Sequence, residues 1–294
     1  MTAAPSLTWL YLKLYPGRLE LLDDTVRVVA APLAAAAADH ASRWFFLRYV
    51  DAAGPHIRLR LLTPLDAADE VAAALPDQLT ALRGLTGRPA ARPAAPPLTL
   101  PGTPAAPEEA APPEARLDVY EPEYAKWGEP RYMAAVEDAF QRSSELAVRL
   151  LAEMDGGLAT RLAVGRCLFG GLLAALPVSD AARERFLASH FEWWTGGARS
   201  GVGPARREAA AAASREMEPE VTARVREIAS SPVVGAAPGV FAASVTEMLP
   251  LADPARKPLF LAFHLLHLML NRLGVTPDEE AVLSLLSRAA WVGE

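Results

Sequence analysis

Two arginines and a histidine alternate with aliphatic residues in a short segment near residue 60. In the sequence HIRLRL, His56, Arg58 and Arg60 fall on one face of a strand, because successive strand side chains point to opposite faces. A guanidinium group is permanently charged and binds a carboxylate through two parallel hydrogen bonds. The row therefore predicts a receptor for carboxylates. The alternative is a solvated basic face whose arginines pair with neighbouring acids.

Acidic, basic and aromatic residues crowd a second segment, YEPEYAKWG, at residues 120–128. Proline and glycine punctuate this segment, so we interpret it as a loop between a short strand and a helix. Loops held by rigid elements commonly carry binding and catalytic groups. The candidates here are Glu123 and Lys126, with Arg131 just beyond. An ordinary packed turn with charged surface residues is the alternative.

A third candidate is a histidine on an otherwise apolar helix near the end of the chain. The segment FHLLHLMLNRLG contains His264, His267 and Asn271, and the last two share a helix face because they are four residues apart. An imidazole titrates near neutral pH and suits proton transfer. A hydrogen-bonded core histidine is the alternative. The segment HFEWW at residues 190–194 is interpreted as aromatic packing.

The composition excludes several classes of protein. The 294 residues are 51% hydrophobic and carry a net charge of −6, with arginines spread among acids, so we expect a globular protein that does not bind nucleic acid directly. The single cysteine, Cys167, lies in an apolar helical pattern and is predicted to be a buried structural thiol. Neither a signal peptide nor a run of about twenty uncharged apolar residues occurs, which predicts a cytoplasmic protein without a membrane segment. Zinc, dinucleotide, P-loop and serine-hydrolase motifs are absent, which argues against a zinc site and against these nucleotide-binding and hydrolase functions.

The elements that must position these residues are strands and helices in the first part of the chain and helices alone in the rest. The first part is expected to contain, in order, a strand at 8–15, a helix over 18–38 with a break near Pro32, a hairpin at 43–61, a helix at 66–85 and a short strand at 116–121. Seven further helices are expected at residues 132–154, 158–176, 180–195, 205–229, 240–249, 257–273 and 277–290. The predicted class is α+β, with an N-terminal mixed or antiparallel sheet covered by helices and a mainly helical C-terminal half packed with it into one unit.

The expected domain organisation follows from this pattern. Residues 1–86 form the sheet-bearing part, and residues 115–294 form the mainly helical part of the same domain. Between them, residues 87–114 are rich in proline and alanine and are predicted to be a flexible loop or linker.

Four segments occur in an order that is typical of one known family. They are W-x-Y-x-K-x-Y near the start, WFFLRY followed by GPHIRLRL, YEPE followed by WG-x-P-x-x-M-x-x-x-E-x-x-F-x-x-S-S, and LLHLMLNRLG close to the end. With these segments the chain resembles the thiopeptide-type bacteriocin biosynthesis proteins, which are similar to the C-terminal elimination domain of lantibiotic dehydratases. The resemblance covers essentially the whole chain. It implies a stand-alone elimination domain, since 294 residues leave no room for the glutamylating domain.

The resemblance implies a cytoplasmic lyase that acts on a ribosomally made precursor peptide with a leader. In that family a separate, tRNA-dependent partner protein esterifies serine or threonine hydroxyls with glutamate. The elimination domain then removes the α-proton and expels glutamate, which leaves dehydroalanine or dehydrobutyrine. Base and acid groups carry this reaction, so the resemblance implies no metal and no redox cofactor.

The resemblance also assigns roles to residues. Arg58 and Arg60 match the family's functional arginines and are expected to hold the glutamyl group, with Arg48 as a helper. His267 matches the functional histidine and is expected to transfer the proton, either as the base or as the acid for the leaving carboxylate. Asn271, in the same helix motif, is expected to contact the substrate.

The acidic motif departs from the family pattern. Glu123 matches the family's acid and is expected to orient an arginine or His267. The family continues with an Arg-Tyr-Gly-Gly segment, but this chain has Lys126 in place of the arginine. Lysine keeps the positive charge but loses the planar fork of the guanidinium, and Arg131 is expected to compensate.

This departure supports the first of two alternatives to elimination. The same scaffold occurs in thiopeptide pyridine synthases, which join two dehydroalanines in a formal [4+2] aza-cycloaddition and release the leader peptide. A non-catalytic module that presents the leader peptide on a strand edge is the other alternative.

Overall fold

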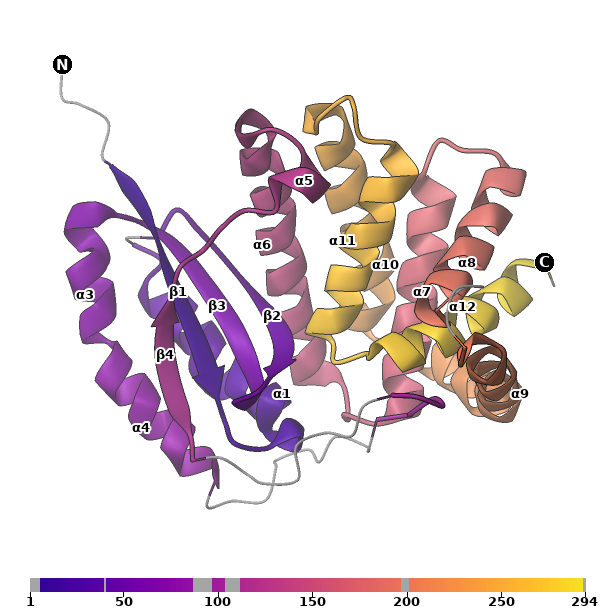
Figure 1. Cartoon of the computed structure of the whole chain (residues 1–294), viewed down its shortest axis with the longest axis horizontal. Coiled ribbons are helices and arrows are strands. Elements are labelled where there is room, and N and C mark those ends of the chain that lie inside the picture. The colour runs from indigo at the N-terminus through magenta and orange to yellow at the C-terminus, as the bar shows by residue number, and fades with distance from the viewer. Residues whose placement is uncertain (1–5, 40, 87–96, 104–111, 197–200, 293–294) are drawn as a thin grey trace. The chain divides into compact units, whose positions relative to one another are not determined.

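The computed structural model describes residues 6–39, 41–86, 97–103, 112–196 and 201–292 (Figure 1). The chain divides into two compact units: Met1–Ala94 with Pro107–Ala152, and Ala95–Ala106 with Glu153–Glu294. The first unit carries an antiparallel four-stranded sheet and the second is helical, so the α+β class is confirmed. The division differs from the expected 1–86, 87–114 and 115–294, because a long helix that follows the fourth strand belongs to the sheet-bearing unit.

The sheet has the strand order β2-β3-β1-β4, and all neighbours are antiparallel. Its strands are β1 (Leu7–Tyr15), β2 (Arg43–Asp51), β3 (Gly54–Pro64) and β4 (Glu114–Asp118). The predicted hairpin is confirmed: Asp51 pairs with Gly54 across a two-residue turn, and Gly54 has a φ of 115° that favours glycine. This turn fixes which residues of β2 share a face with those of β3.

The first unit also contains eight helical segments in the described part of the chain. They are η1 (Leu19–Leu21), α1 (Leu22–Thr25), η2 (Val26–Ala30), α2 (Ala31–Ala36), η3 (Leu65–Ala67), α3 (Ala68–Ala73), α4 (Leu75–Thr86) and α5 (Tyr124–Trp127). The break predicted near Pro32 is present as the π-helical turn η2, since proline lacks the N–H that an unbroken α-helix requires. The helix predicted over 66–85 is divided between α3 and α4 next to Pro76.

A ninth helix, α6 (Pro130–Glu153), covers the outer edge of the sheet along β2 (Figure 1). An edge strand leaves backbone N–H groups without partners. Here the N–H of Phe46 donates to Ser144 Oγ at 3.2 Å, and the N–H of Trp44 donates to Gln141 Oε1 at 3.2 Å. Polar side chains of α6 therefore take the place of a further strand, which ties this helix to the sheet.

The second unit is built from six α-helices in the described residues. They are α7 (Leu158–Ala175), α8 (Asp180–Trp194), α9 (Gly203–Ile228), α10 (Pro232–Met248), α11 (Pro258–Arg272) and α12 (Pro277–Val292). Helix α10 begins at Pro232 and not at residue 240 as predicted. Ser231 caps it by accepting a hydrogen bond from the N–H of Val234 at 3.2 Å, and proline fits the first helical turn.

Part of the predicted linker belongs to the second unit. The N–H of Leu98 donates to Glu279 Oε1 at 3.1 Å, and the N–H of Leu100 donates to Asp278 Oδ2 at 2.9 Å. Leu100 is buried. Residues 97–103 are thus held by the acidic first turn of α12, while the rest of the predicted linker up to residue 111 lies outside the described residues.

Helices α7 and α10 are long and apolar enough to span a membrane by length and composition, and α11 with α12 would form a third, bent span. In α7, 61% of the apolar window is buried, against α9, α10 and α12 among others. Its Arg161 is buried and donates from Nε to the carbonyl oxygen of Gly156 at 3.2 Å. The apolar length of α7 therefore serves as the core of the second unit, which is the other common use of such a helix.

Helices α7 and α10 approach closely at Gly171. A methyl group there would lie 2.7 Å from Pro238 Cβ, whereas Gly170 has nothing within 4 Å. We expect Gly171→Ala to lower the free energy of unfolding by about 1–3 kcal/mol through overpacking. The neighbouring control Gly170→Ala should raise it by up to about 1 kcal/mol, because alanine favours a helix. Urea unfolding measures both, and equal effects would contradict close packing at Gly171.

Candidate functional site

Arg60 lies in a box of aromatic rings on one face of the sheet. Its guanidinium carbon is 4.4 Å from the ring centroid of Tyr11, 5.0 Å from that of Tyr120 and 5.3 Å from that of Phe45. Tyr11 on β1 and Phe45 on β2 are the direct register partners of Arg60. Trp9 packs edge-on against Phe45 and Tyr120, which follows β4. The negative faces of these rings favour a cation.

The guanidinium of Arg60 is buried with unused donors. The residue is only 7% exposed, and neither Nε nor Nη1 has a hydrogen-bond partner among the described residues. Burial lowers the pKa of Arg60, but an arginine stays protonated at neutral pH. A buried donor without a partner costs about 1–3 kcal/mol. An anionic ligand with acceptor oxygens, such as a carboxylate, would satisfy both donors.

Arg58 lies on the same face, held by two contacts. Its guanidinium carbon is 3.4 Å from the ring centroid of Tyr49, and its Nε donates to His56 Nε2 at 3.3 Å. His56 is fully buried, and its Nδ1 lies 3.1 Å from the carbonyl oxygen of Gly54. Burial lowers the pKa of His56, so the ring is neutral with its proton on Nδ1. His56 therefore positions Arg58 and adds no charge to the row.

Arg48 lies on the opposite face of the sheet from Arg58 and Arg60. The register pairs it with Ile57, whose side chain faces the core. Its Nη1 forms an ion pair with Asp23 Oδ1 at 2.6 Å, and both side chains are buried. The expected role of Arg48 as a helper to the other two arginines does not fit this placement. Assuming a two-residue turn in the hairpin would have revealed the correct face.

The acidic motif forms the short helix α5 and the residue before it. Glu123 is exposed, and its Oε2 accepts a hydrogen bond from Lys126 Nζ at 2.7 Å. The negative charge of Glu123 also acts on Arg60, where it opposes the effect of burial on the pKa of that guanidinium. Arg131, at the start of α6, pairs with Glu129 at 3.1 Å and is exposed. Glu123 thus forms a salt bridge with Lys126, and it also lies close enough to Arg60 to oppose part of the lowering of the pKa of that guanidinium.

His267 lies on α11 and contacts a buried acid. Its Nδ1 is 2.6 Å from Oε1 of Glu280 on α12, and 26% of its side chain is exposed. Burial raises the pKa of Glu280, but the neighbouring His267 and His190 outweigh this and hold the pKa below its ordinary value. Asn271 lies one turn after His267 on the same helix. An ionised carboxylate only accepts hydrogen bonds, so Nδ1 of His267 is the donor.

The HFEWW segment packs beside this pair at the end of α8. The ring centroid of Trp194 lies 4.8 Å from that of His267, and its Nε1 donates to His190 Nε2 at 3.1 Å. The same Nε2 is 3.3 Å from Glu280 Oε2, and His190 Nδ1 is 2.7 Å from Ser284 Oγ. The predicted aromatic packing is confirmed, and its His190 lies beside the acid that contacts His267.

The predicted site residues divide between the two units. Arg58, Arg60, Glu123 and Lys126 belong to the first unit, where the charge of Glu123 acts on Arg60. His267 and Asn271 belong to the second, on one helix.

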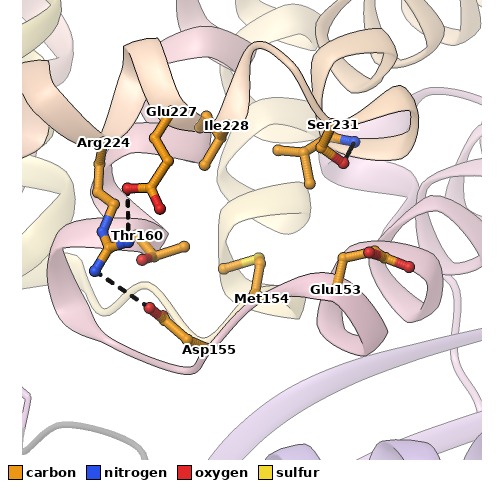
Figure 2. Close-up of a pocket in the computed structure, with 9 residues that line it drawn as sticks. Glu153, Met154, Asp155, Thr160, Arg224, Glu227, Ile228 and Ser231 are labelled. Atoms are coloured by element: carbon orange, nitrogen blue, oxygen red, sulfur yellow. Dashed lines mark hydrogen bonds and ion pairs between the residues drawn. The ribbon is translucent and has the colours of Figure 1, made fainter.

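A cavity of about 290 Å³ in the second unit is lined by none of these residues (Figure 2). There Arg224 lies between Glu227, at 2.8 Å, and Asp155, at 3.5 Å, and Glu153 adds a further acid. The excess of carboxylates makes this cavity a poor receptor for an anionic ligand.

Sequence reasoning missed two sets of contacts. The aromatic box depends on strand pairing, and its members are spread over residues 9–120. Glu280 was visible only as one of three acids in the first turn of a helix, where acids are common. A clear signal for Glu280 was absent, since a contact across a helix–turn–helix depends on the angle of the turn.

The family model for the lantibiotic biosynthesis dehydratase C-terminal domain matches residues 9–290. The chain belongs to this family. The match confirms the resemblance drawn from the four motifs and places the chain among proteins of modified-peptide biosynthesis. No curated protein matches the chain.

Three solved structures share the fold. The tRNA-dependent lantibiotic dehydratase MibB from Microbispora sp. 107891 is 24% identical with a TM-score of 0.56, and the match covers 99% of this chain but 28% of that one. The pyridine synthase TbtD from thiomuracin biosynthesis is 19% identical with a TM-score of 0.67, covering 97% of this chain and 98% of TbtD. TsrL is 16% identical with a TM-score of 0.59, covering 98% and 95%. The chain thus spans about a quarter of the dehydratase and nearly all of the other two.

Proposed function

We propose that this protein is a cytoplasmic lyase that eliminates glutamate from glutamylated serine or threonine residues of a precursor peptide. The observation that carries the proposal is the guanidinium of Arg60, which is buried among aromatic rings with two donors unused. Family membership supports the same reading. A leader-bearing precursor peptide is the proposed substrate, and a separate tRNA-dependent protein is proposed to glutamylate it.

The substrate chemistry matches a cationic receptor. A glutamyl ester retains one free carboxylate, and a second carboxylate forms as the ester oxygen departs. Arg60 and Arg58 are proposed to bind these groups, with Arg60 supplying the buried charge and Arg58 the more exposed one. Fixed cations aimed at developing negative charge lower the barrier of such a step. Glu123 and Lys126 are proposed to tune this receptor through their salt bridge.

Proton transfer completes the elimination. The Cα–H bond breaks, its electron pair forms the Cα=Cβ bond, and the Cβ–O pair leaves with glutamate. We assign the removal of the α-proton to Nε2 of His267, because Nδ1 is engaged with Glu280. Asn271 is proposed to contact the peptide one helical turn away.

The product mass of a glutamylated peptide tests the proposal. Purified protein is incubated with a leader-bearing peptide that carries one glutamylated serine. Elimination gives a peptide one water lighter than the serine form, together with one equivalent of free glutamate. An unchanged ester, with protein that is folded by circular dichroism, would contradict the proposal.

Cycloaddition is the second candidate, and one observation favours it. The similarity to the pyridine synthase TbtD runs over nearly the full length of both chains. A peptide with azoles and two dehydroalanines would then be converted to a macrocycle with release of the leader. The same mass assay, run on that peptide, separates the two reactions. Leader binding without turnover of either peptide would identify a non-catalytic module.

A further inference from the structure

We propose that Glu280 is a positioning residue that fixes the tautomer and orientation of His267 for proton transfer. This inference rests on the proposed function for its kinetic consequence, but the arrangement itself stands on the geometry of the second unit. Oε1 of Glu280 lies 2.6 Å from Nδ1 of His267, within the range of a charge-assisted hydrogen bond.

The surroundings of Glu280 hold its carboxylate in place. The residue is fully buried, and it lies in the first turn of α12, where the helix dipole favours negative charge. Its backbone N–H donates to the carbonyl oxygen of Thr276 at 2.8 Å. The second oxygen, Oε2, forms no hydrogen bond among the described residues and lies 3.3 Å from His190 Nε2.

The contact determines what His267 can do. With its proton on Nδ1, the ring presents the lone pair of Nε2, and no described residue occupies that nitrogen with a hydrogen bond. The ring of Trp194 is tilted against the imidazole, with the two ring centroids 4.8 Å apart, and restrains it from one side. When Nε2 accepts a proton, the adjacent carboxylate stabilises the imidazolium that forms. An acid that orients a histidine in this way acts through it and does not touch the substrate.

Glu279 supplies a matched control in the same helical turn. It is also buried, but its oxygens accept hydrogen bonds from the N–H groups of Leu98 at 3.1 Å and Thr276 at 2.8 Å, and it contacts no imidazole among the described residues. Glu279→Gln therefore removes a buried negative charge from the same first turn of α12 as Glu280→Gln does. It leaves the contact with His267 in place.

The kinetic arm compares these two variants on the glutamylated peptide. We expect Glu280→Gln to lower kcat at least about tenfold with little change in KM, because orientation of a proton-transfer group affects the chemical step. Glu279→Gln should keep kcat within about twofold of the wild type, the ordinary scatter for a residue outside the proton-transfer pair. Equal losses in the two variants would overturn the proposal, since they would assign the effect to the helix and not to the histidine.

The spectroscopic arm needs no turnover and so separates this proposal from the proposed function. Nitrogen-15 spectra of the wild type near pH 8 report the tautomer of His267, identified by the loss of its signals in His267→Gln. The expected result is a proton on Nδ1 and a bare Nε2. A proton on Nε2 would overturn the proposal even in an active enzyme. The expected tautomer in a protein that releases no glutamate would support the pairing while contradicting the reaction.

Discussion

Replacing Arg60 with methionine is expected to abolish glutamate elimination without unfolding the protein. Methionine fills a similar volume among the rings but offers no donor, so we expect kcat/KM to fall by about 100-fold or more, as when a buried charged contact to a ligand is lost. Arg60→Lys should lose nearly as much, because an ammonium cannot reproduce the planar fork. Steady-state kinetics on the glutamylated peptide measures both.

The stability of Arg60→Met distinguishes a binding role from a structural one. Loss of the ring contacts should cost about 0.5–2 kcal/mol, and removal of a buried charge with unused donors should offset most of it. We therefore expect the free energy of unfolding to change by less than about 1 kcal/mol, as for replacement of buried ionic groups by apolar ones. A loss of several kcal/mol would show that Arg60 stabilises the fold.

Arg48 provides the matched comparison on the opposite face of the same sheet. Its ion pair with Asp23 is buried, so Arg48→Met removes one partner of a buried ion pair and should lower the free energy of unfolding by about 3–5 kcal/mol. The two substitutions are therefore expected to have different effects. Arg60→Met loses activity and keeps its stability, whereas Arg48→Met loses stability. Chemical denaturation of both variants measures the contrast.

Replacing His267 with glutamine is expected to lower kcat by about 100-fold or more, the usual contribution of a positioned proton-transfer group. Peptide binding should be retained, because the proposed receptor for the glutamyl group lies in the first unit. His264 is the control on the same helix, where it packs against Phe260 with ring centroids 4.4 Å apart. His264→Gln should keep kcat within about threefold, as expected for a histidine outside the reaction. Equal losses in the two variants would contradict the assignment.

The strands and most helices were predictable because local pattern determines them. Alternation placed Arg58 and Arg60 together on β3, and the turn residues placed the hairpin. The start of α10 was missed, since Pro238 and the glycines around it resemble a loop while Ser231 and Pro232 begin a helix. Ser231 and Pro232 indicate a helix start, whereas Pro238 indicates a break. Tertiary packing determines which of these two signals prevails, and the local sequence does not show that packing.

The candidate site was predictable in its residue types but not in its partners. The resemblance gave Arg60 and His267, yet their contacts come from strands and helices far away in the chain. The face of Arg48 depended on the length of one turn, and a shift of one residue reverses every side chain. The boundary between the units depended on α6, whose polar side chains pair with β2 in a way that no helical pattern reveals.

The fate of the α-proton tests the elimination of glutamate most directly. A peptide whose glutamylated serine carries deuterium at Cα is mixed with excess protein, and free glutamate and peptide mass are followed in a single turnover. Elimination predicts that each glutamate released coincides with loss of one deuterium and formation of dehydroalanine, with a primary isotope effect if proton removal limits the rate. Release of glutamate from a peptide that keeps its deuterium and regains serine would show ester hydrolysis and contradict the proposed reaction.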